Sequence, residues 1–483
     1  MKKIHQLTIL YCTCFITFTF QQKVFSQSVG VGTTTPHSSA ALDISNTSKG
    51  VLMPRMTSAQ RNAIASPAAG LLVFDTDKSC LFMYDGVKWQ PLVFTTLNNL
   101  PGTERAPDSV GTQDYLGYSV DINGDYAVAG APPDKVNGIS KGAAYVFEKI
   151  NGNWISTARL IASDGAADDE FGAAVSVSGD YIAIGARSDN TSTVDNHGSV
   201  YIFHRVAGVW TQEFKIRPAD FGENDYFGWS VSISGDNLVV GSVDDDNGAV
   251  QSTGSIYFFQ RSGTTWTQLN KFYRPGNQAN EYFGTTVRMD GDYAITSSIH
   301  ATVSGNTDAG CVCVYVYGGG TWNFQTTINN IAPTAPFFGA AIDIEGDCIV
   351  INRPGSSSSY STIYTYQRTS NIWNYKGQLT YTPVGLGYGF GLSISLSGNY
   401  LLIGTSLQNN RSSYLFKKDT GSFSWQFARD VSFSTPPVSY QMEPYTAAAD
   451  MVAISGENCI FGNPVSGVNG LMSGNVLFLN VGD

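Results

Sequence analysis

One stretch decides the fold: Phe171-Gly-Ala-Ala-Val-Ser-Val-Ser-Gly-Asp-Tyr-Ile-Ala-Ile-Gly185. Residues 175–177 and 182–184 alternate apolar and polar side chains, which predicts two β-strands. Ser178-Gly-Asp-Tyr181 predicts a tight hairpin turn between them, because glycine reaches the backbone angles that such turns need. Beyond a loop, residues 200–203 and 214–216 predict two more strands. The unit therefore encodes four antiparallel strands.

This unit recurs along most of the chain. A Phe-Gly or Leu-Gly pair precedes its turn in six copies, and a tryptophan follows the turn in six copies. Repeats of this length with four strands are typical of propeller blades. We therefore predict an all-β chain folded as a seven-bladed β-propeller of four-stranded antiparallel blades. At intervals of 55, 56, 56, 55, 52 and 58 residues, the turns are Gly124-Asp125, Gly179-Asp180, Gly235-Asp236, Gly291-Asp292, Gly346-Asp347, Gly398-Asn399 and Gly456-Glu457.

The two ends of the repeat region predict how the ring closes. The seventh unit supplies three strands, of which the last covers residues 476–479. The apolar stretch Leu92–Leu97 lies upstream of the first unit, and we expect it to complete the seventh blade so that no open edge remains. The expected parts of the chain are a signal peptide at residues 1–26, a small β-rich module at 27–90 and the propeller at 91–483.

The repeats resemble the FG-GAP family, whose best-known members are the propellers at the head of integrin alpha chains. The resemblance rests on the Phe-Gly pairs and on Gly130-Ala131-Pro132. It implies the propeller fold and, in many members, calcium bound by a DxDxDG-like loop. That interval here is only the short hairpin of the Ser-Gly-Asp type, with a single carboxylate, whereas calcium needs about six to eight oxygen ligands. We therefore expect no cofactor and no metal site.

Residues 27–90 lack the repeat. The segments Val29-Gly-Val-Gly-Thr33, Lys49-Gly-Val-Leu-Met-Pro-Arg-Met56 and Thr57-Ser-Ala-Gln-Arg-Asn-Ala-Ile64 resemble a leader of secreted bacterial surface proteins and parts of phage tail-fibre-like proteins. That resemblance implies presentation or oligomerisation. Residues 71–77 and 80–89 predict a β-hairpin that runs on toward the propeller.

Charge and composition exclude some classes of function. The net charge is −11, which disfavours a nucleic-acid partner. Lys2 and Lys3, the apolar run at 7–20 and the small residue Ser26 predict a secretory signal that is cut near Ser26. No later stretch is apolar for long enough to span a membrane. We expect a secreted or cell-surface protein without a transmembrane span.

Five cysteines would remain after that cleavage, and an odd number does not suit a disulfide framework. The five are Cys80, Cys311, Cys313, Cys348 and Cys459. Cys311 and Cys313 point to one face of a predicted strand, where they read as buried free thiols. A Cys313–Cys348 bridge or a metal site is the alternative.

The candidate binding surface is the face of the disc with the long loops, which join the second strand to the third and each blade to the next. If neighbouring blades bring the acidic residues of these loops together, they would hold a cation or a basic ligand. The alternative is a solvated acidic rim that aids solubility. The acidic candidates are Asp168, Asp169, Asp225, Asp244, Asp245 and Asp246.

Aromatic residues occupy the position just before the Phe-Gly pair in four units, as Tyr115, Tyr226, Tyr282 and Phe337. The repeat predicts that they form a ring near the mouth of the central channel, where exposed rings would stack on sugars. The alternative is packing between blades, because aromatic side chains dominate core burial.

No sequence motif of a known catalytic class is present, and the histidines occur singly. We therefore expect an extracellular binding or adhesion module that recognises a protein or carbohydrate, and not an enzyme. Two alternatives stay open. One is a secreted hydrolase that acts on glycans through an acidic pair such as Asp169 and Asp225. The other is a structural spacer in a cell-surface assembly.

Overall fold

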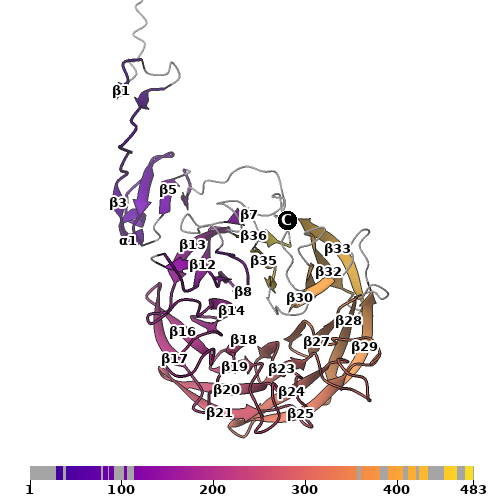
Figure 1. Cartoon of the computed structure of the whole chain (residues 1–483). Helices are drawn as coiled ribbons and strands as arrows, with labels where there is room; N and C mark the ends of the chain where they lie inside the picture. Colours follow the sequence, from indigo (N-terminus) through magenta and orange to yellow (C-terminus); the bar gives the residue numbers. More distant parts are fainter. Residues whose placement is uncertain are drawn as a thin grey trace, which may run out of the picture. The chain divides into compact units, whose positions relative to one another are not determined.

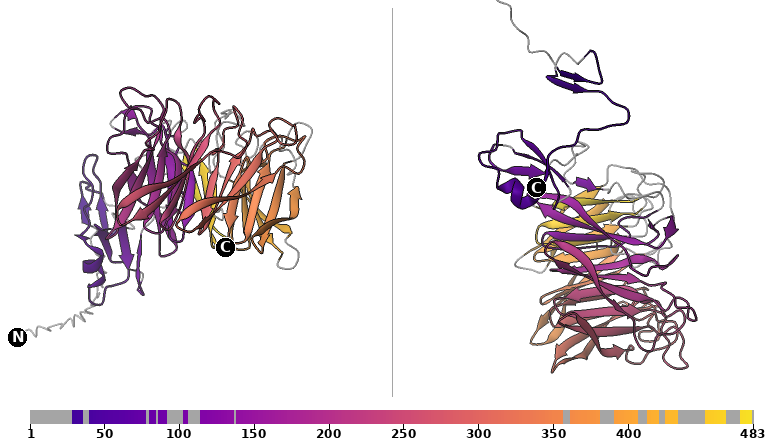
Figure 2. Two further views of the ribbon diagram at one scale, coloured as in Figure 1. Left: turned by 90° about the horizontal axis from the view of Figure 1, so that it is seen from below. Right: turned by 90° about the vertical axis from the view of Figure 1, so that its left-hand side faces the viewer.

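The computed structural model describes residues 29–35, 40–77, 80–84, 86–91, 103–105, 114–136, 138–355, 361–380, 390–405, 412–419, 424–432, 451–464 and 474–481. The expected signal peptide, its cleavage point near Ser26 and the stretch Leu92–Leu97 lie outside these residues. The chain divides into two compact units, Met1–Trp89 and Gln90–Asp483 (Figures 1 and 2).

The first unit is β-rich. β1 (Val29–Val31) pairs in parallel with β2 (Leu42–Ile44), and a second sheet has the order β3 (Arg55–Met56), β4 (Leu72–Asp75), β5 (Cys80–Tyr84), β6 (Trp89–Pro91). The expected hairpin is formed by β4 and β5. Sequence reasoning missed the short helix α1 (Ser58–Asn62), although Thr57 and Gln60 form the capping box that starts it. No helix in the described part of the chain is long and apolar enough to cross a membrane.

Seven four-stranded antiparallel sheets form the ring in the described residues, as the repeat predicts (Figure 1). The unit quoted above forms the second blade, with β14 (Phe171–Ser178) innermost, then β15 (Tyr181–Ala186), β16 (Ser199–Val206) and β17 (Val209–Ile216). The first blade is β8 (Val120–Asn123), β9 (Tyr126–Ala131), β12 (Ala143–Ile150) and β13 (Asn153–Leu160), with the small hairpin β10 (Lys135–Val136) and β11 (Ile139–Ser140) in its loop.

The later blades keep the same order from the channel outward. The third is β18 (Phe227–Ser234), β19 (Asn237–Ser242), β20 (Ser255–Ser262) and β21 (Thr265–Phe272). The fourth is β22 (Val287–Asp290), β23 (Tyr293–Ser298), β24 (Cys311–Gly318) and β25 (Thr321–Asn329). The fifth is β26 (Ile342–Glu345), β27 (Cys348–Arg353), β28 (Thr362–Thr369) and β29 (Ile372–Thr380). The sixth is β30 (Phe390–Ser397), β31 (Tyr400–Thr405), β32 (Ser412–Lys418) and β33 (Trp425–Ser432).

The core lies between neighbouring blades. Val128 and Val146 of the first blade pack in one cluster with Val175 and Ile182 of the second. The Phe171 ring is fully buried in that cluster, edge-on to Tyr201 and Phe203. Apolar burial therefore joins each blade to the next, and the alternating pattern of the strands supplies it.

Glycine is required where consecutive blades touch. A Cβ on Gly185, in β15, would lie 2.1 Å from the carbonyl oxygen of Gly228 in the next blade. The same approach recurs across the closure, where a Cβ on Gly462 would lie 2.0 Å from the oxygen of Gly117. The Phe-Gly pair of one blade and the second-strand glycine of the blade before it are thus two sides of one close contact.

The ring closes between the seventh and first blades. The seventh blade contains β34 (Val452–Ser455), β35 (Asn458–Asn463) and β36 (Asn475–Asn480), and its fourth strand is β7 (Thr103–Arg105). A strand from the N-terminal side completes this blade, as expected, but the described strand that pairs with β36 is β7 and not Leu92–Leu97. An outermost strand is held by backbone hydrogen bonds and faces solvent, so the polar sequence of β7 gave no apolar signal.

A ring of hydrogen bonds joins the hairpin turns. In each blade the turn glycine donates its backbone N–H to the side chain just before the turn in the preceding blade, and the bond from Gly124 to Ser455 Oγ, 3.1 Å long, crosses the closure. The ring is therefore continuous. Its acceptors are Asn123, Ser178, Ser234, Asp290, Glu345, Ser397 and Ser455.

The four described cysteines whose state the structure gives are free thiols. Cys311, Cys313 and Cys459 are buried in the core, and Cys348 is partly buried. The alternative of a Cys313–Cys348 bridge is therefore wrong. The thiols pack as small apolar groups.

Candidate functional site

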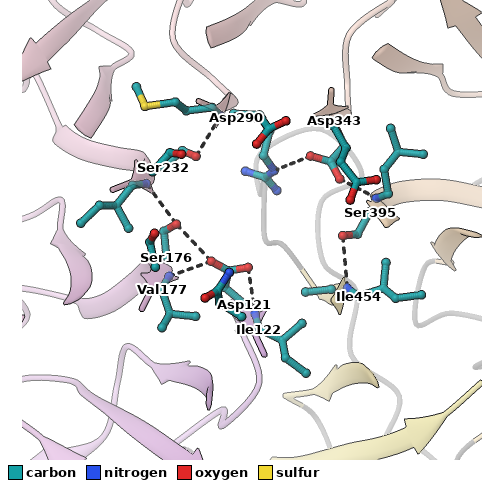
Figure 3. A pocket seen from close by; sticks show the side chains of 18 of the residues that line it. Asp121, Ile122, Ser176, Val177, Ser232, Asp290, Asp343, Ser395 and Ile454 are labelled. Atoms are coloured by element: carbon teal, nitrogen blue, oxygen red, sulfur yellow. Dashed lines mark hydrogen bonds and ion pairs between the residues drawn. The ribbon is translucent and has the colours of Figure 1, made fainter. Parts of the chain in front are cut away.

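The innermost strands line a polar cavity of about 180 Å³ inside the ring (Figure 3). One residue per blade lines it at the same level, and we call this the channel position. At three blades its serine hydroxyl accepts a backbone N–H of the following blade, over 3.0–3.2 Å. In chain order the channel position holds Asp121, Ser176, Ser232, Arg288, Asp343, Ser395 and Ala453.

Arg288 breaks the serine pattern, because a guanidinium offers no acceptor. The backbone N–H of Ile344 in the next blade therefore turns to Asp343 Oδ1, at 2.9 Å. The other oxygen of Asp343 accepts from Leu396, one blade further on, at 2.6 Å. The guanidinium of Arg288 lies 3.8 Å from the same carboxylate. Asp343 alone thus accepts the two backbone N–H groups that two separate serines would accept in the regular pattern.

Ala453 also offers no side-chain acceptor to the next blade. Asp121, on the other side of the ring closure, supplies the missing acceptor. Asp121 accepts from Ile122 at 2.9 Å and from Val177, in the next blade, at 2.8 Å. Burial raises the pKa of Asp121 to about 6 and that of Asp343 to about 7, against smaller opposing effects of hydrogen bonds and of Arg288. These raised pKa values belong to carboxyls that join blades, so they do not by themselves mark a catalytic site.

In three blades the carboxylate of the hairpin turn, where the family resemblance would place calcium, pairs with an arginine. Asp180 pairs with Arg205 at 2.5 Å, and Asp347 pairs with Arg368 at 2.5 Å. Each arginine also stacks on a tyrosine of the preceding blade. Among the described residues, no group of three or more His, Cys, Asp or Glu side chains is arranged to hold a metal ion.

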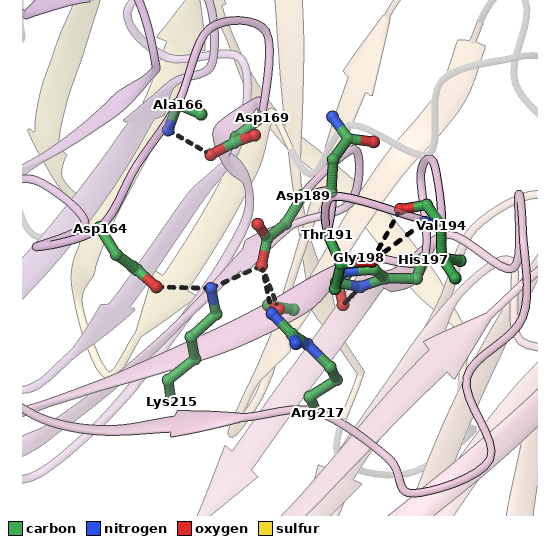
Figure 4. Close-up of polar contacts among 12 residues, drawn as sticks. Asp164, Ala166, Asp169, Asp189, Thr191, Val194, His197, Gly198, Lys215 and Arg217 are labelled. Carbon is green, nitrogen blue, oxygen red and sulfur yellow. Dashed lines mark hydrogen bonds and ion pairs between the residues drawn. The ribbon is translucent and has the colours of Figure 1, made fainter.

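On the loop face, acidic side chains converge on lysine. In the second blade Lys215 Nζ lies 2.8 Å from Asp164 and 2.7 Å from Asp189 (Figure 4). The third blade repeats this arrangement, with Lys271 Nζ 2.8 Å from Asp220 and 2.7 Å from the predicted site residue Asp245. Carboxylates of these two clusters are therefore compensated inside the protein.

Asp169 and Asp225 occupy equivalent positions beside these two clusters. Both are buried, at 2% and 6% exposed. Asp169 accepts the backbone N–H of Ala166 at 2.6 Å, and Asp225 accepts that of Gly222. Burial raises the pKa of both carboxyls, to about 6 for Asp225. Each lies near the lysine of its own blade.

The other acidic candidates lie nearer the surface. Asp168 is exposed, and its backbone adopts a left-handed φ of 63°. Asp246 is exposed and accepts the backbone N–H of Ser252 at 2.8 Å. Asp244 is half-buried, and burial raises its pKa. The six predicted acidic residues therefore do not form one group.

The aromatic candidates share a strained backbone. Tyr115, Tyr226, Tyr282 and Phe337 have φ values between 51° and 63°, and Glu170 has 56° in the same position of the second blade. Left-handed backbone costs a residue with a Cβ roughly 1–2 kcal/mol. The repeat keeps this conformation in the first five blades, and all five side chains are half-buried.

These aromatic residues join a wider group that sequence reasoning missed. Tyr226 packs edge-on against Trp229, over which the Arg187 guanidinium stacks at 4.4 Å. Tyr282 and Phe337 flank the His300 ring, each with centroids 5.4 Å from it. Sequence reasoning also missed the lysines of the two clusters. A signal was present, because Lys215 and Lys271 each lie five residues after the tryptophan of their repeat unit, Trp210 and Trp266.

No curated protein matches the chain. Among solved structures, a candidate 6-phosphogluconolactonase from Bacteroides uniformis is 12% identical, covering 74% of this chain and 93% of its own, with a TM-score of 0.44. The periplasmic gluconolactonase of Pseudomonas aeruginosa is 15% identical, covering 68% and 86%, with a TM-score of 0.42.

Two family models match the sequence itself. Residues 106–147, 154–203 and 210–259 match the FG-GAP repeat. Residues 30–103 match the phage tail like trimerisation region. The chain thus contains three stretches that match the FG-GAP repeat, within a β-propeller fold, and before them a stretch that matches the phage tail like trimerisation region.

Proposed function

We propose that this chain is a non-catalytic extracellular binding protein, in which the first unit associates with two further copies and the propeller recognises a protein or glycan through its loop face. The observation that carries the proposal is the row of half-buried aromatic side chains before the Phe-Gly pairs. Strained backbone that recurs at one position of a rigid scaffold is typical of functional sites.

Self-association is supported by an apolar face on the first unit. The parallel pairing of β1 with β2 puts Val29 and Val31 beside Leu42 and Ile44, on one side of a two-stranded sheet. These side chains are 57%, 51%, 57% and 39% exposed, respectively. A sheet of two short strands is marginally stable alone, so it gains stability from partner strands. The match to a trimerisation region favours copies of the same chain.

Recognition at the loop face is supported by its aromatic and cationic groups. Trp229, with Arg187 over its ring, and His300, between Tyr282 and Phe337, come from successive blades of a closed ring. Half-buried aromatic rings supply large contact area at low entropic cost, because they have few rotatable bonds. Three copies of such a surface would also bind a repetitive partner more tightly than one copy.

A binding role is also favoured over hydrolysis by the acidic residues. A glycan hydrolase needs two carboxyls about 5–10 Å apart across the scissile bond. Asp164, Asp189, Asp220 and Asp245 instead neutralise lysines within their blades. The expected export signal at residues 1–26 places the protein outside the cell in this proposal.

The recognition half is tested with a glycan and protein array, using the recombinant chain from residue 27 with and without calcium. We expect a specific hit that survives without calcium and weakens at least about tenfold in the double variant Tyr226→Ala/Tyr282→Ala. Val209→Ala is the matched control, because Val209 is 61% exposed at the first residue of β17, at the opposite end of its blade. A blank array in both conditions would favour the spacer.

The self-association half is tested by analytical ultracentrifugation. We expect a trimer for the chain from residue 27, and monomer for the variant Val31→Ser/Ile44→Ser. A monomeric parent protein would contradict this half and leave the recognition half to stand on the array.

A further inference from the structure

We propose that the outer rim of the fourth, fifth and sixth blades is a second binding surface, on which sugar rings of a linear neutral glycan stack on Phe324, Tyr375 and Phe427. This surface belongs to the fourth strands β25, β29 and β33, which lie on the outer edge of the ring (Figure 1). It is separate from the loop face, so it goes beyond the proposed function.

The three residues occupy one position of the repeat. Each lies two residues after the tryptophan of the fourth strand, which is Trp322, Trp373 or Trp425. A β-bulge follows this position in six blades, with the register shift at the same place each time. Bulges turn a side chain in a new direction and are common near binding sites. The first three blades carry the polar residues Ser156, Gln212 and Gln268 at this position, whereas the next three carry aromatic ones.

The aromatic side chains are accessible and backed by further rings. Phe324 is 40% exposed, Tyr375 is 45% exposed and Phe427 is 48% exposed. Phe324 packs edge-on against Tyr315 of the neighbouring strand, with centroids 5.7 Å apart, and Tyr375 packs against Tyr366 at 5.7 Å. A ring that packs on one side against another ring and is exposed to solvent on the other is suited to stacking. Its side chain is already ordered, so little conformational entropy is lost when a ligand binds.

Two buried hydroxyls beneath these rings point to a polar ligand. The hydroxyls of Tyr315 and Tyr366 have no hydrogen-bond partner among the described residues, although the side chains are 0% and 5% exposed. Four of the other five blades place a phenylalanine here and the seventh places Leu479, so no other blade has a hydroxyl at this position; the phenylalanines are Phe147, Phe203, Phe259 and Phe416. An unpaired buried hydroxyl destabilises the folded protein, because its hydration is lost without a replacement hydrogen bond. At this position of the repeat, an unpaired hydroxyl occurs in the described blades only below the exposed rings of Phe324 and Tyr375, which is explained if sugar hydroxyls approach there when those rings shift.

Hydrogen bonds between blades fix the spacing of the platforms. Trp373 Nε1 donates to Gln325 Oε1 at 3.1 Å, and Gln325 Nε2 donates to the Asn371 carbonyl at 3.2 Å. These bonds join β25 to the start of β29, so Phe324 and Tyr375 sit on a preorganised frame. Aromatic platforms at a fixed spacing along an edge match an extended chain of sugar rings better than a compact partner.

The charge of this rim favours an uncharged glycan. β25 contains no charged residue, β29 contains Lys376 alone, and β33 contains Arg429 and Asp430. The chain as a whole has a net charge of −11. A basic peptide would find no carboxylates on β25 or β29, and an acidic polymer would be repelled by the rest of the surface. The side-chain amides of Asn323, Asn374 and Gln378 lie exposed in these strands and suit sugar hydroxyls.

The experiment is affinity electrophoresis and pull-down of the recombinant chain with cellulose, laminarin, xylan, mannan and chitin, and with alginate as an acidic comparison. We expect retention by at least one neutral polysaccharide and none by alginate. The triple variant Phe324→Ser/Tyr375→Gln/Phe427→Gln copies the residues of the first three blades, and we expect it to weaken binding at least tenfold. Its melting temperature should stay within a few degrees of the parent, since the side chains are exposed.

Three further results decide the matter. The control Gln212→Ala/Gln268→Ala alters the same position in the second and third blades and should bind as the parent does. The conservative variant Phe427→Tyr should also keep binding. Tyr226→Ala/Tyr282→Ala changes the loop face only, so it should leave polysaccharide binding intact, which separates this surface from the proposed function. No retention by any neutral polysaccharide, or equal retention of the triple variant, overturns the proposal.

Discussion

Replacing Arg288 and Asp343 together with serine should restore the regular hydrogen-bond pattern of the channel. Asp343→Ser alone leaves one hydroxyl for two donors, the backbone N–H groups of Ile344 and Leu396. It also removes the carboxylate that lies 3.8 Å from Arg288. In the double variant the hydroxyl at position 288 is placed to accept from Ile344 of the next blade, as Ser176 accepts from Ile233, and the hydroxyl at position 343 accepts from Leu396.

The sizes follow from the groups left unpaired. A buried N–H without an acceptor costs about 1–3 kcal/mol, and a partly buried guanidinium without its carboxylate adds to that loss. We expect Asp343→Ser to lower the free energy of unfolding by about 2–4 kcal/mol. The double variant should recover at least half of this loss, which is a coupling energy of at least about 1 kcal/mol between the two positions.

The measurement is urea denaturation of the parent, the two single variants and the double variant at one pH. Ser232→Ala is the matched control, because its hydroxyl accepts the N–H of Met289 at 3.0 Å and its loss leaves one donor unpaired with no charge involved. If Asp343→Ser is as stable as the parent, or if the double variant is no more stable than Asp343→Ser, the account of the channel is refuted.

The same variants give a pH test. The pKa of Asp343 is about 7 in the folded protein, above the value of about 4 for an exposed aspartate, so the folded chain binds its proton more tightly. Stability from this group is therefore full below about pH 4 and is lost as pH rises toward 7. The double variant lacks the group, and its unfolding free energy should fall less than that of the parent between pH 4 and 7.

Three more outcomes are expected. Tyr315→Phe removes an unpaired buried hydroxyl and should raise stability by about 1 kcal/mol, whereas Tyr317→Phe removes a hydroxyl bonded to Gln260 at 2.8 Å and should lower stability in the same thermal melt. Lys271→Met leaves two aspartates without a cation and should cost about 3–5 kcal/mol in urea denaturation, while Lys376→Met, on an exposed side chain, should cost almost nothing. Truncation after Asn463 removes β36 and opens the ring, so cooperative unfolding should be lost in calorimetry, and a melt like that of the full chain would contradict the closed ring.

Much of the fold could be predicted because it depends on repeated local signals. Seven glycine turns in register, six of them followed by an acidic residue, fix the number of blades, and alternation along each strand fixes which face is buried. The closing strand was the exception. Residues 103–105 are polar and lie at the outer edge, where backbone pairing decides the position and apolar side chains do not. A stretch chosen by hydrophobicity was therefore the wrong one to expect.

The candidate site could be predicted only as a region. The position of Tyr226 and Tyr282 on the loop face follows from strand order, but their left-handed backbone and their ring partners depend on tertiary packing. The acidic residues show the limit more clearly. Asp245 looked like a free ligand in its loop, and the structure places it against Lys271, which lies on the fourth strand of the same blade. Pairing across that distance leaves no local trace in the sequence.

Residues that depart from the repeat pattern differ in whether a neighbouring residue compensates for the change. Arg288 departs from serine at the channel position, and Asp343 in the next blade supplies the missing acceptor, so the departure is compensated within the ring. Tyr315 departs from phenylalanine in the fourth blade, and no described residue satisfies its hydroxyl. A compensated change can drift in a repeat at little cost in stability, whereas an uncompensated one persists against a cost of about 1–3 kcal/mol. The rim, where the uncompensated changes lie under exposed aromatic rings, is therefore the place where a ligand best explains what the fold alone does not.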